Sequence, residues 1–164
     1  MNSFTDLGYI FLALSLIIAV YGCTASIISV VNQSSSLRAR ALASTYCIAL
    51  LMILASSILV YSFISQDFGL RYVTMHSNES MPIHYVIAAF YSGQEGSLLY
   101  WSTTLSVLTA VSLYIYRNAN YKIIGYTTGI LTAIFIFFLY VLVFQANPFE
   151  RLPMSMPDGQ GLNP

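Results

Sequence analysis

Four long runs of apolar residues, separated by polar stretches, dominate this chain. They cover residues 7–31, 41–65, 97–116 and 123–146, and none contains a charged residue. A helix of about 20 apolar residues crosses the ~30 Å hydrocarbon core of a bilayer. Only a helix or a closed barrel satisfies its own backbone hydrogen bonds in that medium. The pattern therefore predicts an all-α membrane protein with four transmembrane helices.

The connections within this pattern predict two helical hairpins. Residues 32–40 join the first two spans, and residues 117–122 join the last two. Such short connections favour antiparallel neighbours. The first two spans also contain small residues, which let helix backbones approach closely in lipid: Gly22, Ala25, Ser26, Ser29, Ala43, Ala49, Ala55, Ser56 and Ser57. We expect a transmembrane region over 1–146 and a separate tail over 147–164.

The segment 66–96 between the hairpins is long for a loop of so small a membrane protein. Its second half, from Pro82 to Ser92, is apolar and aromatic but too short to span a bilayer. We expect an interfacial or re-entrant helix that begins near Pro82, since proline suits a first helical turn. Tyr85, Phe90 and Tyr91 fit an aromatic belt at the level of the headgroups.

The tail 147–164 changes character. Prolines at 148, 153, 157 and 164 stop helix propagation, and Asp158-Gly159 signals a turn. We expect this tail to be extended, with no element of its own that ties it to the helices.

Composition agrees with a membrane protein, and the basic residues predict its orientation. Only 7% of the residues are charged, against about 25% in soluble domains. Four basic residues flank the two short connections: Arg38, Arg40, Arg117 and Lys122. The positive-inside rule makes those connections cytoplasmic. Both chain ends and the segment 66–96, with Arg71 and Arg151, then lie outside. The first span lacks a basic n-region and is too long for a cleavable signal peptide.

The balance of charge and the missing motifs exclude several functions. Six acidic residues match six basic ones, so nothing favours binding to nucleic acid. No nucleophile–base pair, phosphate-binding loop or HExxH motif occurs. The uncharged spans argue against ion translocation by this chain alone. Cys23 and Cys47 lie within spans and are read as packing residues.

Two histidines, His76 and His84, lie in the segment 66–96. They could face a haem, a metal or solvent, and a histidine in such a segment is most often polar surface. No third ligand accompanies them, so the sequence does not predict a zinc site.

Glu95 is the sharper candidate, because a carboxylate beside an apolar span costs free energy unless something uses it. It lies between Gly93 and Gly96, at the expected start of the third span. The helix dipole favours a negative charge there by about 0.3–1 kcal/mol. Alternatively, the glycines admit a backbone or a flat ligand, and Glu95 holds a donor. Trp101, the single tryptophan, is a belt anchor or packs against a planar ligand.

Four segments follow one another between Asp67 and Pro164: DFGLRYVTMHSN, MPIHYVIAAFYSGQEGSLLYW, NPFERLP and PDGQGLNP. In this order they resemble the N-terminal part of the CcmF/NrfE/CycK family of cytochrome c maturation proteins. The most specific elements are NPFERL (147–152) and GxEGSLLxW, which comprises Gly93, Glu95, Gly96, Ser97, Leu98, Leu99 and Trp101.

The resemblance implies a component of haem lyase in the prokaryotic cytoplasmic membrane or an organellar inner membrane. The family receives haem from a haem chaperone and helps join its vinyl groups to the CxxCH cysteines of apocytochrome c. It also holds a haem b, implied for the whole family assembly and not for this chain alone. Membrane lipid is a further expected partner, and nucleic acid is not. Glu95, Trp101 and the flanking glycines become weak candidates for haem or partner contact, with His76 and His84.

The chain departs from the family in its length. Family members are several times longer, and their tryptophan-rich WWD segment and haem-ligating histidines lie beyond the point that matches Pro164. We therefore expect the remaining CcmF part, or a separate WWD-bearing chain, to supply the haem-binding residues. The chain is then a fragment or a split subunit of a CcmF-type haem lyase. The alternative is a non-enzymatic four-helix structural or accessory subunit of a membrane complex.

Overall fold

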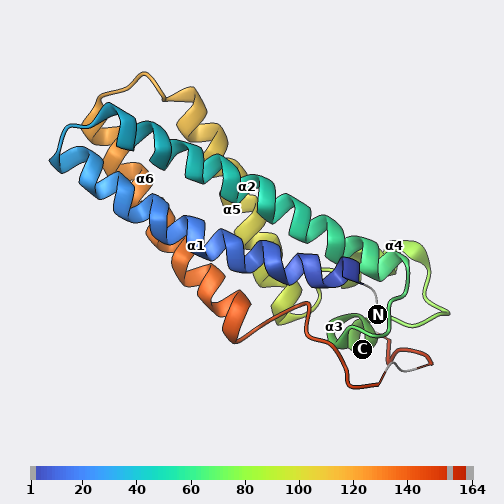
Figure 1. Cartoon of the computed structure of the whole chain (residues 1–164). Coiled ribbons are helices and arrows are strands. Elements are labelled where there is room, and N and C mark those ends of the chain that lie inside the picture. Colours follow the sequence, from blue (N-terminus) through green and yellow to red (C-terminus); the bar gives the residue numbers. More distant parts are fainter. Residues whose placement is uncertain (1–2, 155–156, 162–164) are drawn as a thin grey trace.

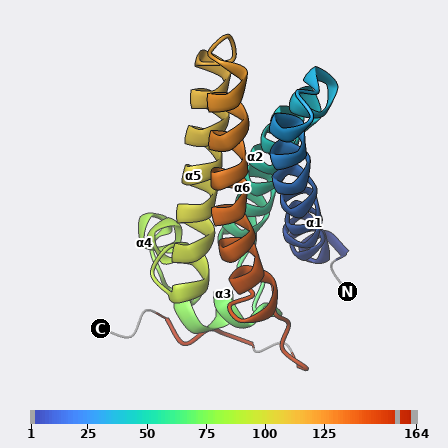
Figure 2. The same cartoon turned by 90° about the vertical axis from the view of Figure 1, so that its left-hand side faces the viewer.

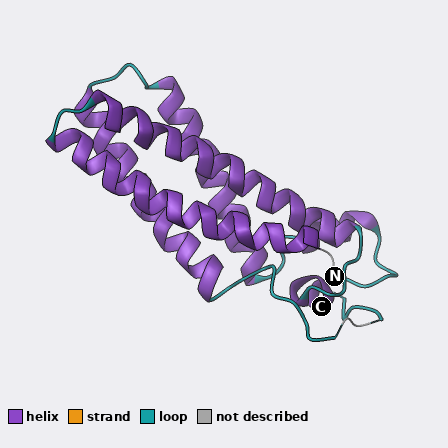
Figure 3. Ribbon diagram, viewed as in Figure 1, coloured by secondary structure: helices purple, strands orange, loops and turns teal. Residues whose placement is uncertain are grey.

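The computed structural model describes residues 3–154 and 157–161, and this part of the chain is helical (Figure 3). Its six helices follow one another as α1 (Ser3–Val31), α2 (Ser35–Ile64), α3 (Arg71–His76), α4 (Ile83–Ala89), α5 (Gln94–Ile115) and α6 (Tyr121–Phe144). Among the described residues the sole β-pairing is an isolated antiparallel bridge between Leu70 and Arg151.

Four of the helices are long and apolar enough to cross a membrane: α1, α2, α5 and α6. The prediction of an all-helical protein with four such spans is confirmed. The helices begin before the uncharged runs, at their N-terminal ends. α2 begins at Ser35, before Arg38 and Arg40, and the Ser34 hydroxyl caps it by accepting from the Leu37 N–H at 3.4 Å. Asn120 caps α6 in the same way, accepting from the Lys122 N–H at 3.0 Å.

Helix α1 packs against both α2 and α6, and small residues line these contacts. A β-carbon on Gly22 would lie 2.2 Å from the Ser44 hydroxyl of α2, so α1 and α2 approach as closely as glycine permits. On the other side, the Ser26 hydroxyl donates to the Gly125 carbonyl of α6 at 2.6 Å. The two consecutive pairs are antiparallel, but α5 packs more against α2 than against α6, and α6 packs mainly on α1. The second helix pair, α5 and α6, therefore packs against the first pair, α1 and α2.

The short connections, from α1 to α2 and from α5 to α6, lie at one end of the bundle, and the long connection from α2 to α5 lies at the other end. We call the end with residues 32–34 and 116–120 the hairpin end. The opposite, terminal end carries α3, α4, the start of α1 and the described part of the tail (Figures 1 and 2). The short helix expected after Pro82 is α4. The other short helix, α3, is not expected from the sequence.

The described part of the tail has no helix or strand of its own, yet hydrogen bonds attach it to the terminal end, which the sequence did not indicate. The Arg71 N–H donates to the Glu150 carbonyl at 2.9 Å, and the Leu152 N–H donates to the Gly69 carbonyl at 3.0 Å. Phe149 is buried and its ring touches Gly8 of α1. Backbone pairing and one buried ring fasten the tail without any helix or strand.

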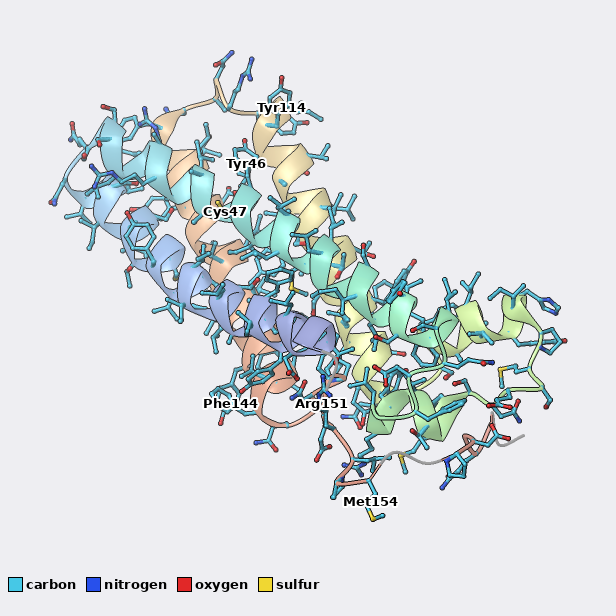
Figure 4. The ribbon with its side chains drawn as sticks, turned by 45° about the vertical axis from the view of Figure 1, so that its right-hand side comes forward. Tyr46, Cys47, Tyr114, Phe144, Arg151 and Met154 are labelled. Atoms are coloured by element: carbon cyan, nitrogen blue, oxygen red, sulfur yellow. The ribbon has the colours of Figure 1, made fainter. Side chains whose placement is uncertain are left out.

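Two ion pairs add to this attachment. Arg151 contacts Asp6 at 2.8 Å and also the Thr5 hydroxyl, so it lies beside the start of α1 (Figure 4). Arg71 contacts Glu150 at 2.7 Å, and the side chains of this pair are half exposed. Further along, the Gln160 N–H donates to the Thr74 carbonyl of α3 at 2.7 Å. The tail therefore touches α1 and α3 as well as the segment that connects α2 to α3.

Candidate functional site

The start of α5 places Glu95 in the first helical turn, after Gly93 as the N-cap residue. Glu95 is partly buried, and its carboxylate makes no hydrogen bond or ion pair with any described residue. Gly93 has no side chain to cap the helix, and Glu95 lies in the first turn, where backbone N–H groups have no intrahelical partner. The helix dipole stabilises this charge.

Beneath the start of α5 lies Tyr72, which sequence reasoning did not single out. Its hydroxyl accepts from the Gly93 N–H at 3.0 Å and lies 3.1 Å from the Phe90 carbonyl, to which it donates. The ring is buried and packs edge-on against Phe63 of α2 at 5.5 Å. One side chain of α3 thus links α2, the end of α4 and the start of α5.

The Tyr72 phenol is held in its protonated form. Burial raises its pKa above the ordinary value, the hydrogen bond from Gly93 opposes this rise, and the charge of Glu95 adds to it. A protonated hydroxyl can donate to one backbone group and accept from another. We call Tyr72, His76, Gly93, Glu95 and Gly96 the α3/α5 junction.

Both glycines of the junction admit groups of the chain itself. A β-carbon on Gly96 would lie 1.8 Å from the Phe90 carbonyl oxygen and 2.4 Å from the Tyr72 hydroxyl. A β-carbon on Gly93 would lie 2.5 Å from His76 Nε2. The groups that approach these positions are therefore a backbone carbonyl and two side chains of α3.

His76 and His84 differ in their surroundings. His76 ends α3, donates from Nδ1 to the Tyr72 carbonyl at 2.9 Å, and stacks on the Tyr72 ring at 4.4 Å. Its Nε2 faces Gly93. His84 lies on the exposed side of α4, where its ring contacts Tyr85 at 4.4 Å.

The described residues do not fit a haem-iron site. His76 uses Nδ1 as a donor, which leaves Nε2 as the nitrogen that could bind iron. Nε2 faces Gly93 at the start of α5, so an iron bound to it would crowd this turn. His84 has no second ligand beside it, and no cluster of three His, Cys, Asp or Glu side chains occurs among the described residues.

Trp101 lies apart from this junction. It is 62% exposed on α5 and contacts the neighbouring Tyr100 at 5.8 Å. At about 100° per residue, six positions turn it about 240° around the helix from Glu95. The structure thus brings together His76, Gly93, Glu95 and Gly96, and leaves Trp101 and His84 on other surfaces.

Comparison with known proteins gives several matches that extend over nearly the whole of this chain. It is 30% identical over 159 residues to the cytochrome c-type biogenesis protein NrfE of Haemophilus influenzae, a match that covers 97% of this chain. It is also 30% identical over 160 residues to CcmF of the same organism, and 31% identical over 131 residues to CcmF of Escherichia coli. The chain is homologous to the CcmF/NrfE/CycK family. No protein-family model matches it.

The fold agrees with this homology. The solved structure titled "Cytochrome c Heme Lyase CcmF" superposes with a TM-score of 0.82 over 90% of this chain, at 20% sequence identity. The chain spans about a quarter of the length of the CcmF and NrfE proteins of Haemophilus influenzae, since it covers 25% of each. It corresponds to one four-span part of a CcmF-type fold.

Sequence reasoning missed Tyr72 because α3 is too short to show a period. Of its six residues, Tyr72, Val73 and Thr74 are buried in succession, so no alternation marks a helix face. One signal was present: an aromatic residue inside DFGLRYVTMH, four residues before a histidine. Four residues is one helical turn, which places the Tyr72 ring against His76.

Proposed function

We propose that this chain acts in cytochrome c maturation as a membrane part of a CcmF-type haem lyase. The observation that carries the proposal is the match to CcmF and NrfE proteins over 97% of the chain. The CcmF-like arrangement of the helices supports it. The assembly takes haem from a haem chaperone and helps attach it covalently to apocytochrome c.

Within that assembly the four spans act as a scaffold, and the terminal end forms part of the surface on which haem and apocytochrome meet. Haem itself is bound by the remaining CcmF part or by a separate WWD-bearing chain. The support for this division is that Nε2 of His76 faces Gly93 and that His84 is exposed beside Tyr85. The junction serves as the wall of the site: Tyr72 fixes α3 to α5, and the Glu95 carboxylate is left for a donor on a partner.

We place the protein in the prokaryotic cytoplasmic membrane or an organellar inner membrane, with the terminal end outside. The α4 helix then lies in the outer interface. Its inward residues Val86 and Ala89 are buried on the bundle, whereas Ile83, Tyr85 and Ile87 are each about half exposed. An apolar, aromatic face of this kind favours the headgroup region of a bilayer.

The test is the covalent haem content of c-type cytochromes in cells that lack the gene. Membrane and soluble fractions are separated by denaturing electrophoresis and stained for haem, which detects only haem that survives denaturation. We expect loss of stained c-type cytochromes, restored by the gene on a plasmid, with haem b content unchanged. Normal staining in a strain without a paralogue would contradict the proposal. Co-purification with an unrelated membrane complex would favour the accessory-subunit alternative.

A further inference from the structure

An open groove runs between α2 and α5 in the half of the bundle near the terminal end. It consists of two adjoining hollows of about 270 and 400 Å³ that share Ser56, Phe90 and Thr103. Phe90, at the end of α4, is buried and closes the groove at the terminal end. Tyr61 of α2 and Leu108 of α5 form its rims, and both are more than half exposed. We call this feature the α2/α5 groove.

The lining of the groove is mostly apolar and is interrupted by four serine and threonine residues: Ser56, Ser57, Thr103 and Thr104. The hydroxyls of Ser56 and Thr103 lie 2.7 Å apart and bond across the two helices. Next to them, Thr104 lines the groove, and its hydroxyl makes no hydrogen bond with any described residue. In hydrocarbon an unpaired hydroxyl is unfavourable, because no water is present to satisfy it. A polar side chain of a neighbouring helix in the groove would give the Thr104 hydroxyl a partner that lipid chains cannot supply.

The helix that carries Thr104 is also poorly matched to lipid. α5 has the lowest mean hydropathy of the four spans, 1.4 against 2.2 to 2.5 for the others. It is also the least covered, with 28% of its most apolar window buried against 33% to 44%. The span that faces lipid most should be the most apolar, and here the order is reversed. The exposed side of α5 therefore has the character of a protein-facing surface.

The size of the relatives indicates what covers it. The chain covers 25% of the CcmF and NrfE proteins of Haemophilus influenzae, so about three quarters of each lies outside the matched part. A groove parallel to two helices accepts a third helix about 8–10 Å away, by the packing of ridges into grooves. Small and hydroxyl-bearing residues are the side chains that join helices in lipid.

We propose that the α2/α5 groove is the docking site for a transmembrane helix from the remaining part of the CcmF-type assembly, in the same polypeptide or in a second one. The docked helix presents a small or hydrogen-bonding side chain to Thr104 and Thr103 and covers Leu108. This proposal rests on the proposed function, since it takes the remaining part of a CcmF-type protein as the partner.

The experiment is photo-crosslinking in the native membrane. A benzophenone amino acid replaces Leu108 or Ile53, which line the groove, and Ile17, an exposed apolar residue of α1 that does not line it, serves as the matched control. After irradiation the adducts are mapped by mass spectrometry. We expect both groove positions to capture peptides of one membrane-spanning helix of the CcmF-type assembly. Adducts with lipid alone, or with a second copy of this chain, would overturn the proposal. So would capture of the same helix from Ile17.

A second variant tests the hydroxyl. Thr104→Val keeps the volume and removes the hydrogen-bonding group, and we expect the adduct yield from Leu108 to fall about threefold, the effect of one interhelical hydrogen bond. Thr127→Val, at an exposed threonine of α6, should leave the yield unchanged. An unchanged yield for both would remove Thr104 from the contact. Lipid capture in cells whose cytochrome c maturation depends on the gene would refute the docking and leave the proposed function intact.

Discussion

At the residue scale, the Tyr72 hydroxyl joins more elements than any other single group of the junction. It accepts a hydrogen bond from the Gly93 N–H and donates one to the Phe90 carbonyl, and the Tyr72 side chain is buried. A buried donor or acceptor that loses its partner costs about 1–3 kcal/mol. The hydroxyl should therefore contribute to stability although the ring provides most of the packing.

We expect Tyr72→Phe to lower the free energy of unfolding by about 1–3 kcal/mol, because it leaves two backbone groups without a partner. The measurement is thermal unfolding of the detergent-solubilised protein. Tyr85→Phe is the matched control, since Tyr85 is exposed on α4 and should change the midpoint little. Equal midpoints for Tyr72→Phe and the wild type would mean that water or a rearranged backbone replaces the hydroxyl.

Glu95 gives the prediction that separates a structural role from a functional one. A dipole contact is worth about 0.3–1 kcal/mol and would tolerate Glu95→Gln. We expect this variant to reduce haem-stained c-type cytochrome several-fold at an unchanged level of the protein, because the carboxylate makes no hydrogen bond or ion pair with any described residue and is free to hold a donor on a partner. Glu79→Gln, at an exposed carboxylate between α3 and α4, should keep wild-type staining. Wild-type staining for Glu95→Gln would leave the helix dipole as the whole explanation.

The sequence could indicate Glu95 and the glycines beside it, but it could not indicate that Tyr72 contacts this segment. A carboxylate between two glycines before an apolar span is visible in the letters alone. Tyr72 lies more than 20 positions earlier in the chain, and its link to Gly93 depends on a long-range contact that no local period records. The same holds for His76, whose Nε2 faces Gly93 only because α3 folds back under α5.

At the element scale, the start of α5 is fixed by a close approach of backbone to backbone. Gly96 faces the Phe90 carbonyl, which cannot swing away as a flexible side chain could. In α6, by contrast, a β-carbon on Gly129 would meet its nearest neighbour at 3.6 Å, which is ordinary contact. Substitution by alanine should therefore affect the stability of the protein differently at these two glycines.

We expect Gly96→Ala to destabilise the protein by about 1–3 kcal/mol, the usual cost of overpacking. Gly129→Ala should be neutral or slightly stabilising, since alanine favours helix over glycine by about 0.8–1 kcal/mol. Unfolding midpoints of the two variants in the same detergent provide the comparison. A Gly96→Ala protein as stable as Gly129→Ala would show that the turn between α4 and α5 can shift without cost.

The tail is an element held by burial more than by charge. Phe149 is buried against Gly8, while both ion pairs are largely exposed. Fully buried phenylalanine contributes about 3–5 kcal/mol against alanine, and an exposed ion pair about 0.2–1 kcal/mol. The ring should therefore decide whether the tail stays bound.

We expect Phe149→Ala to speed tryptic cleavage after Arg151 by more than about tenfold, because cleavage follows the population of the detached state. Arg71→Gln, which removes one ion pair, should change the rate by less than about fivefold. Release of the peptide from residue 152 onward, followed by mass spectrometry, gives the rates. Similar rates for both variants would mean that the backbone pairing at Leu70 and Arg151 holds the tail by itself.

The long elements were predictable and the short ones were not, for a physical reason. A run of about 20 successive apolar residues predicts a membrane span, so α1, α2, α5 and α6 could be predicted from the apolar runs of the sequence. The short α3 helix and the bound tail depend on contacts between distant segments, such as Leu70 with Arg151. Proline and turn residues in the tail predicted no helix, and the residues of the tail that the structure describes form none, but these signals did not indicate the segment with which the tail pairs.

At the scale of the whole molecule, charge is segregated between the two ends of the bundle. The hairpin end carries four basic residues and no acidic one: Arg38, Arg40, Arg117 and Lys122. All six acidic residues lie at the terminal end, together with Arg71 and Arg151. Both of these arginines are paired with carboxylates there. The basic residues of the hairpin end have no carboxylate partners among the described residues, so their unpaired positive charge should determine the orientation in the membrane.

This segregation predicts that the hairpin end faces the cytoplasm, because lysine and arginine in short loops are retained there. With Cys23 and Cys47 replaced by serine, single cysteines are placed at Asn118 in the hairpin end and at Glu79 in the terminal end, both exposed. We expect a membrane-impermeant maleimide to label position 79 in intact spheroplasts and position 118 only after the membrane is permeabilised. The reverse pattern would place the junction and the tail in the cytoplasm. Haem delivery from outside would then be impossible at this surface, and the role proposed for Glu95 would fail with it.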